Sequence, residues 1–169
     1  MSIVVGMKLS QGVEWGLHAA SLLGLAPAGA AVRRERLAGH YALPEAYLAK
    51  HLQAMTRAGL LRASPGPKGG YQLARPAAEI TVLDVVEAVE GPARPFLCQE
   101  IRQRGEGAIR PEECTVPCAI STVMDDAHDA WRATLRDVTI ADLIARMRPA
   151  VRKRNEALMR GDQPRGFSL

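Results

Sequence analysis

The chain has 169 residues, of which 47% are hydrophobic and 4% aromatic. This length allows one core with extensions, or two small domains. The scarcity of aromatic residues excludes a long stacking surface for single-stranded nucleic acid. Residues 1–6 form too short an apolar run for a signal peptide, and no segment approaches the length of a membrane span. We therefore expect a cytoplasmic protein with no membrane partner.

Charge is distributed unevenly along the chain. Residues 31–76 carry eight Arg and Lys against two Glu, whereas residues 77–145 carry six against thirteen Asp and Glu. Residues 146–169 are basic again, with seven Arg and Lys against two acidic residues. Basic segments around an acidic middle favour a polyanionic partner, although a solvated charged surface remains the alternative.

The first expected helix covers residues 8–25, where apolar residues recur at helical spacing and Ser10 is available as an N-cap. Glu14 and His18 lie four residues apart and therefore share one helical face, with Trp15 beside them. Such a pair is usually an ordinary surface contact. It can also supply two ligands to one metal.

Residues 32–58 predict a helix-turn-helix. A short helix at 32–41 opens with Arg33, Arg34 and Arg36, and Pro44 is well placed to begin a second, amphipathic helix that ends before Gly59. The second helix buries Leu48, Leu52 and Met55 and leaves a face rich in hydrogen-bonding groups.

A β-hairpin is expected at residues 60–74, because two alternating runs flank a Pro- and Gly-rich turn with Lys68 at its tip. A hairpin directly after a helix-turn-helix is typical of a winged-helix DNA-binding domain. A further helix begins near Thr81 and stops at Gly91.

The three cysteines lie in one polar segment, Phe96 to Ile120, with the spacing C-x15-C-x3-C. A structural cysteine usually sits alone on an apolar face, so three in a polar loop indicate thiolate chemistry. In a reducing compartment such cysteines bind metal or sense redox state more often than they form stable disulfides.

An apolar stripe about twenty residues long follows at residues 119–138. We expect it to form a homodimer interface, with an intramolecular bundle as the alternative. His128 is expected at an exposed position of this helix. Residues 140–147 predict a short return helix, and residues 148–169 a basic, flexible tail.

Several of these segments together resemble the Rrf-two-type bacterial regulators, the family of IscR, NsrR and RirA. They are Met7 to Ser10, Tyr47-Leu48, Arg57 to Leu60, the wing Gly66 to Leu73, and Ile80 to Gly91. The resemblance covers about residues 7–145. It implies a mainly α fold with a small β-wing, and a dimeric transcription factor carrying an iron–sulfur cluster between a cysteine loop and the first helix of the other subunit.

The resemblance also implies the division of the chain. Residues 1–91 would form the winged helix-turn-helix domain, and 92–118 the loop that binds the cluster. Residues 119–147 would provide the dimerisation and return helices, and 148–169 the tail.

The cysteine pattern departs from that family. Its first gap is fifteen residues long, and Ser121 stands where a histidine ligand can follow the third cysteine. The expected ligands of a [2Fe–2S] cluster are therefore Glu14 and His18 from one subunit, with Cys98 and Cys118 from the other. Cys114 is an alternative in place of Cys118 or Glu14.

The resulting hypothesis is a redox-responsive regulator that binds a double-stranded DNA operator. Glu45, Tyr47 and Lys50 would contact base edges, whereas Arg33, Arg34 and Lys68 would hold phosphates. Trp15 is a candidate switch residue, although it also suits a plain core position.

Three other functions stay open. One is a metal-free sensor that switches through a Cys98–Cys118 disulfide, and another is a sensor of nitric oxide or of cluster supply. A zinc site with the same ligands is chemically allowed. An enzyme is not expected, because the sequence has no nucleophile–base pair, P-loop or dinucleotide fingerprint.

Overall fold

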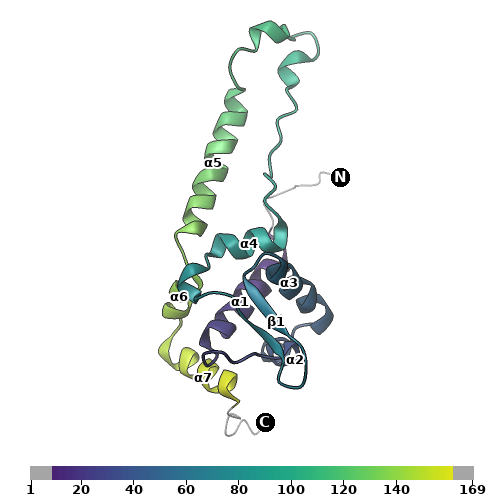
Figure 1. The fold of residues 1–169 in the computed structure, drawn as a ribbon. Coiled ribbons are helices and arrows are strands. Elements are labelled where there is room, and N and C mark those ends of the chain that lie inside the picture. Colours follow the sequence, from purple (N-terminus) through teal and green to yellow (C-terminus); the bar gives the residue numbers. More distant parts are fainter. Residues whose placement is uncertain (1–8, 162–169) are drawn as a thin grey trace. The chain divides into compact units, whose positions relative to one another are not determined.

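The computed structural model describes residues 9–161, which divide into two compact units (Figure 1). The first unit comprises the chain up to Pro92 and again from Leu135, and the second comprises residues 93–134. The first unit contains α1 (Gln11–Leu25), α2 (Arg34–His40), α3 (Glu45–Arg57), β1 (Leu61–Ser64), β2 (Gly70–Leu73), η1 (Ala77–Glu79), α4 (Val82–Glu90), α6 (Ile140–Ala145) and α7 (Pro149–Arg160). This mainly helical fold with one two-stranded sheet confirms the predicted fold class.

Helix α1 lies at the centre of the first unit. Its residues Ala19, Ala20, Leu22 and Leu23 are buried, and the helix packs against α3, α4, α6 and α7. From α3, Leu48, Leu52 and Met55 enter the same core, as their helical spacing predicts. The core therefore fixes α1 against the second helix of the helix-turn-helix.

The wing is an antiparallel hairpin in which Leu61 pairs with Leu73 and Ser64 with Gly70. Val32, just before α2, adds a third short segment through two 2.8 Å backbone hydrogen bonds with Tyr71. Gly70 makes this approach possible: its φ is +148°, and a Cβ would lie 2.6 Å from the Val32 carbonyl carbon. The wing is thus tied directly to the start of α2.

The return segment belongs to the first unit. Thr81 and Thr139 pair across a β-bridge, and each caps its own helix, with a capping box to Asp84 and Asp142 respectively. Ile140 is fully buried, and α6 packs on α1. The short return helix predicted at residues 140–147 is therefore present as α6 (Ile140–Ala145), and it packs on α1 of its own chain.

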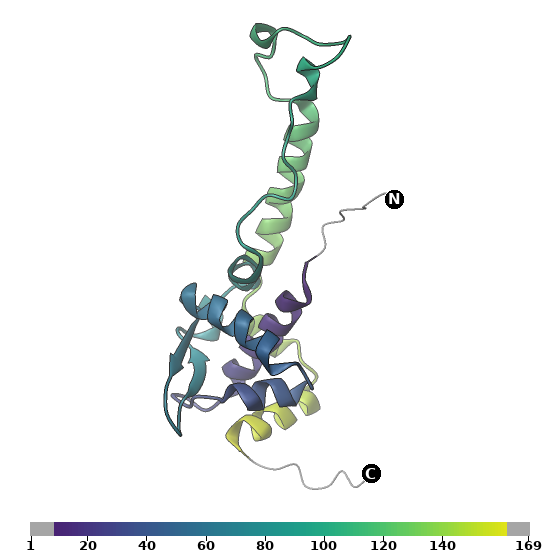
Figure 2. The same cartoon turned by 90° about the vertical axis from the view of Figure 1, so that its right-hand side faces the viewer.

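The expected flexible tail is wrong for residues 149–160, which form α7. Pro149 stands at the first position of the helix, and Gly161 ends it in the left-handed conformation, with φ +98°. Asn155 and Met159 are buried, and α7 packs on α1 (Figure 2). The strongly basic composition concealed this narrow buried face. Residues 162–169, also assigned to the tail, lie outside the described residues.

The second unit contains a long loop with two short 3-10 helices, η2 (Ile101–Gln103) and η3 (Pro111–Glu113). Helix α5 (Ala119–Arg136) follows and supplies the rest of the unit. Arg94 ties the loop to α5 through Asp125 at 2.7 Å and Asp129 at 3.2 Å.

His128 of α5 is buried, with 7% of its surface exposed, so its expected exposed position is wrong. Its ring stacks on Trp131, with centroids 5.7 Å apart. The exposed position was inferred from polarity alone, and an imidazole ring can instead be covered by a neighbouring aromatic side chain.

Large apolar side chains lie on the surface of the second unit. Ile120 and Val123 of α5 are 65% and 64% exposed. The loop adds Leu97, Ile101 and Val116, each more than 60% exposed. Such a concentration of exposed apolar side chains is typical of a surface that another chain covers.

Candidate DNA interface and cysteine loop

Three surfaces carry the candidate functional residues. The helix-turn-helix with its wing and the Glu14–His18 face of α1 belong to the first unit, and the cysteine loop belongs to the second. On α3, Tyr47 is 67% exposed and Lys50 is also exposed. Both side chains are therefore available to the edges of bases in a DNA groove.

Glu45 is engaged with Arg34. The Arg34 Nε donates to Glu45 Oε1 at 2.7 Å, and its Nη2 lies 2.6 Å from the same oxygen. This pair joins the first turns of α2 and α3. The sequence analysis assigned Arg34 to a phosphate and Glu45 to a base edge, but in this structure the two side chains neutralise each other's charge.

Arg33 binds the wing. Its Nη2 donates to the Pro67 carbonyl oxygen at the tip of the hairpin, which connects the start of α2 with the turn beside exposed Lys68. Arg33, Arg36 and Lys68 line a hollow together with Ala31, Val32 and Gly69. Arg36 was not assigned a DNA contact from the sequence, although its i,i+3 spacing from Arg33 would have indicated a shared face.

Glu14 and His18 are both exposed, one turn apart on α1. Glu14 has no hydrogen-bond or ionic partner among the described residues, so its carboxylate is free to bind a ligand. The His18 ring lies 4.8 Å from the Tyr41 ring, which follows the end of α2. The face of α1 that carries both residues therefore touches the helix-turn-helix.

Trp15 is half-buried beside this face and meets His51 of α3 edge to face, with ring centroids 6.0 Å apart. Burial lowers the pKa of His51, as does the charge of Lys50, while Glu90 opposes the shift. His51 also covers Gly12 of α1. Two ring contacts connect α1 to the helix-turn-helix. Trp15 meets His51 of α3, and His18 meets Tyr41 at the end of α2.

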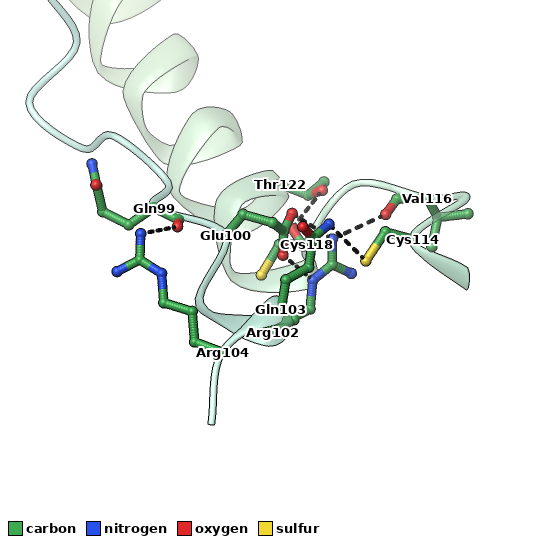
Figure 3. Close-up of polar contacts among 9 residues, drawn as sticks. All are labelled: Gln99, Glu100, Arg102, Gln103, Arg104, Cys114, Val116, Cys118 and Thr122. Carbon is green, nitrogen blue, oxygen red and sulfur yellow. Dashed lines mark hydrogen bonds and ion pairs between the residues drawn. The ribbon is translucent and has the colours of Figure 1, made fainter. Parts of the chain in front are cut away.

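Arg102 organises the cysteine loop (Figure 3). Its guanidinium forms a bidentate contact with Glu100 at 2.5 and 2.8 Å, and Nη2 also donates to the Val116 carbonyl oxygen at 3.3 Å. Gln103 donates to the Cys114 sulfur at 3.4 Å. These contacts hold Arg102 and Gln103 against Cys114 and Val116, so the segment shortly after Cys98 lies beside Cys114.

Cys118 stands immediately before α5. Backbone N–H groups of Ser121 and Ile120 lower the pKa of its thiol, and Arg102 contributes more weakly in the same direction, against the opposing effects of burial and Glu100. The thiolate is the form that binds metals and attacks disulfides. Cys98 is exposed, and Cys114 and Cys118 are partly covered.

The donor set suits an iron–sulfur cluster chemically, since it offers thiols, one imidazole and one carboxylate. Glu14 and His18 belong to the first unit and the three cysteines to the second. Within residues 9–161, no three His, Cys, Asp or Glu side chains are grouped to hold a metal ion. The expected set takes ligands from two subunits, so a single chain is not expected to assemble it.

The paired helices, the exposed face of α3 and the hairpin bound to α2 define a winged-helix DNA-binding protein. Residues 9–146 match the Rrf2 family, described as an iron-dependent transcriptional regulator. The chain belongs to the Rrf2 family, whose members are DNA-binding transcriptional regulators.

Relatives agree with this assignment. The chain is 30% identical over 142 residues to YwgB of Bacillus subtilis, named as an HTH-type transcriptional regulator, and the match covers 83% of this chain and 86% of that one. It is 35% identical over 121 residues to the protein aau3 of Rhizobium meliloti, in a match that covers 70% of this chain and 73% of that one.

Solved structures show the same fold. Oxidized CymR of Staphylococcus aureus is 27% identical, with a TM-score of 0.60 over 81% of this chain and 95% of that one. IscR of T. potens is 22% identical, with a TM-score of 0.62 over 86% of this chain and 96% of that one. Among residues 9–161, no helix is long and apolar enough to cross a bilayer.

Proposed function

We propose that this protein is a redox-responsive transcriptional regulator whose affinity for its operator is controlled by a [2Fe–2S] cluster at a dimer interface. Glu14 and His18 of one subunit and Cys98 and Cys118 of the other would hold the cluster, with Cys114 as the alternative ligand. The segments Gly12–His18 and Cys98–Gly105 resemble those of the family member RsrR, which supports this ligand set. The iron dependence in the family's description supports the metal.

One observation carries the link between the metal and DNA: the two α1 ligands lie on the helix that touches the helix-turn-helix. Trp15, next to Glu14, meets His51 of α3, and His18 itself meets Tyr41. A change in charge at Glu14 and His18 therefore acts on side chains that contact the DNA-reading helices.

A [2Fe–2S] cluster supplies reversible one-electron chemistry, and histidine ligation raises its potential. The protein contributes position and charge. Cys118 has a lowered thiol pKa, which favours the ligating thiolate, and Arg102 lies beside it as a compensating cation. Trp15 is the side chain that would transmit a movement of α1 to α3.

A homodimer fits this proposal, because both the ligand set and the operator would then follow a two-fold axis. The exposed apolar side chains of α5 and the cysteine loop would form its interface. The two copies of α3 would enter successive major grooves, which sets half-sites one or more helical turns apart.

Protein purified without oxygen tests the metal centre. We expect visible absorption and, after dithionite, an EPR signal of a reduced [2Fe–2S] cluster. His18→Ala and Cys98→Ala should remove both signals, whereas the control His40→Ala, one helix away, should retain them. Operator affinity of the wild-type protein should differ between the oxidised and reduced forms. Iron-free, colourless protein whose DNA affinity ignores oxidant and reductant would refute the proposal.

A second candidate is a metal-free thiol sensor, which the environment of Cys118 favours. Two thiols, Cys98 and Cys118, would lose two electrons and two protons to a peroxide, which becomes two waters as the S–S bond forms. CymR of Staphylococcus aureus, which is structurally similar to this protein, has a crystal structure in an oxidized form.

Mass spectrometry separates the two candidates. A loss of two hydrogens from iron-free protein after peroxide, with a Cys98–Cys118 peptide after digestion, supports the thiol sensor. Cys118→Ser should then abolish the change in operator affinity that peroxide causes, whereas His18→Ala should leave this change intact. Equal loss of response in both variants supports the metal centre instead.

A further inference from the structure

Helix α7 follows the part of the chain that matches the family. The match ends at residue 146, and α7 covers Pro149–Arg160. Between residues 148 and 161 stand five Arg and Lys and a single Glu. Only Asn155 and Met159 of this helix are buried, so its basic side chains lie on the surface. The helix therefore adds positive charge to the winged-helix scaffold.

Helix α7 is the yellow helix below the helix-turn-helix in Figure 2. The charge of Arg154 acts on His40, where it adds to the pKa lowering that burial causes, and also on Tyr41. At the other end, a Cβ on Gly161 would lie 3.7 Å from the Arg36 guanidinium. The two helices are thus antiparallel, and α7 ends beside the first turn of α2.

That first turn of α2 already carries a basic hollow. Arg33, Arg36 and Lys68 line it, and neither Arg36 nor Lys68 has an ionic partner among residues 9–161. Their unpaired donors suit phosphate oxygens, because a phosphate accepts from several cations at once. Lys153 and Arg154 in the first half of α7 and Arg160 at its end add further positive charge, although Arg160 also lies 3.6 Å from Glu156 of its own helix.

We propose that α7 is a second contact for DNA, in which Lys153, Arg154 and Arg160 bind phosphates of the backbone that continues past those held at the hollow of Arg33, Arg36 and Lys68. The partner is the sugar–phosphate backbone of duplex DNA that flanks each half-site. Phosphates carry no base identity, so the contact adds affinity and footprint length without adding sequence choice. This inference rests on the DNA-binding function and not on the cluster.

Salt dependence of DNA binding measures the contact. Each phosphate neutralised on duplex DNA contributes about 0.9 to the slope of log K against log salt. Replacing Lys153, Arg154 and Arg160 by Gln should lower the slope by about 2 to 3 per subunit bound, and weaken affinity at least tenfold at low salt. The reduction should be the same factor for operator and for random duplex, measured by fluorescence anisotropy.

The matched control neutralises three other cations, at the end of α6 and in the first turn of α7: Arg146→Gln, Arg148→Gln and Arg152→Gln. This variant carries the same net charge as the first one. Arg146 and Arg148 precede the first helical residue of α7, and Arg152 lies 3.7 Å from Glu156. The slope of log K against log salt should stay close to the wild-type value in this control. Equal slopes for the two triple variants would overturn the proposal, because only overall charge would then matter.

Operator duplexes of increasing flank length give a second readout. Wild-type affinity should rise as flanks are added and then level off, whereas the Lys153/Arg154/Arg160 variant should gain much less. A wild-type affinity independent of flank length would contradict a flanking contact. Circular dichroism and thermal unfolding check that both triple variants fold.

The result also separates this inference from the proposed redox function. The triple variant retains every proposed cluster ligand, so its DNA affinity should fall by the same factor in the oxidised and the reduced protein. A redox response that persists while the salt slope falls supports the α7 contact alone. If the DNA affinity of the wild-type protein is the same in both redox states, while the triple variant still has the lower salt slope, only the cluster proposal is refuted.

Discussion

At position 12, where α1 meets the DNA-reading helix α3, a side chain fits only if the His51 ring moves. A Cβ on Gly12 would lie 2.6 Å from both ring nitrogens of His51, which is far inside van der Waals contact. The same ring meets Trp15 edge to face. A single glycine therefore sets how closely α3 approaches the helix that carries the proposed ligands Glu14 and His18.

Gly12→Ala should destabilise the protein by about 1–3 kcal/mol, since the added methyl group forces the packed imidazole to move. It should also weaken operator binding, because His51 belongs to the reading helix. Urea denaturation and anisotropy measure the two effects. In the double variant with His51→Ala, the cost of the alanine should largely disappear.

Gly39 provides the control for this substitution. It lies within α2, and no atom lies within 4 Å of the place that an added methyl group would take. Gly39→Ala should therefore be neutral or stabilise the protein by up to about 1 kcal/mol. If Gly12→Ala behaves like Gly39→Ala, the contact between Gly12 and His51 does not constrain α1.

His51 makes a pH-dependent contribution to stability. Its pKa in the folded protein lies below the ordinary value of 6.5 because burial disfavours the charged ring. The unfolded chain then binds the proton more readily, so stability falls as the pH drops below about 6.5 and stops falling below the folded pKa. Urea midpoints between pH 7.5 and 5.5 should decline less in His51→Gln than in the wild-type protein. Equal declines of the urea midpoint in the two proteins would exclude His51 as a source of the pH dependence.

At the scale of elements, the return segment is held by its helix cap. The Thr139 hydroxyl accepts from the Asp142 backbone N–H at 3.1 Å, and the Asp142 carboxylate accepts from the Thr139 backbone N–H at 2.8 Å. The next residue, Ile140, is fully buried. The box therefore fixes both the start of α6 and the point where the chain rejoins the first unit.

Thr139→Ala should cost about 1 kcal/mol, because it leaves helical N–H groups without their acceptor. Thr139→Ser retains the hydroxyl and should cost much less. Thermal unfolding measures both. Thr134→Ala serves as the comparison, since that hydroxyl only returns to the Ala130 carbonyl oxygen of its own helix at 3.0 Å. Equal effects of all three substitutions would show that the cap contributes nothing.

The sequence predicted the elements whose periodicity is local. The residues of α1, α3, the hairpin and α5 follow apolar spacing or turn chemistry, and the structure confirms each within a few residues. Helix α7 was missed because its stability depends on contact with α1, through two buried residues that a basic composition hides. Tertiary packing, which no local pattern encodes, decides such a helix.

The candidate site divides in the same way. Exposure of Tyr47 and Lys50 followed from the amphipathic pattern of α3, and the structure confirms it. The ion pair of Arg34 with Glu45 and the bond from Arg33 to the wing join residues 11 and 34 positions apart. Neither could be read from spacing, because both depend on how α2, α3 and the wing fold onto one another.

For the whole molecule, the surface of α5 makes the oligomeric state a direct test. Val123→Glu places a charge among the exposed apolar side chains of this helix and should convert a dimer to a monomer, since a buried unpaired carboxylate is costly. Analytical ultracentrifugation measures the change. Ala133→Glu adds the same charge on another side of α5 and should remain dimeric. A wild-type monomer would remove the basis for a ligand set shared between subunits.

The pair formed by Arg34 and Glu45 also bears on attempts to redirect this regulator to a new promoter. Glu45 begins the reading helix, so it is an obvious position to randomise, yet each replacement without a carboxylate releases the Arg34 guanidinium beside the groove. A library that varies only position 45 would therefore select partly for whatever the liberated arginine binds. Varying both positions together would let selection distinguish a new base preference from a loss of internal neutralisation.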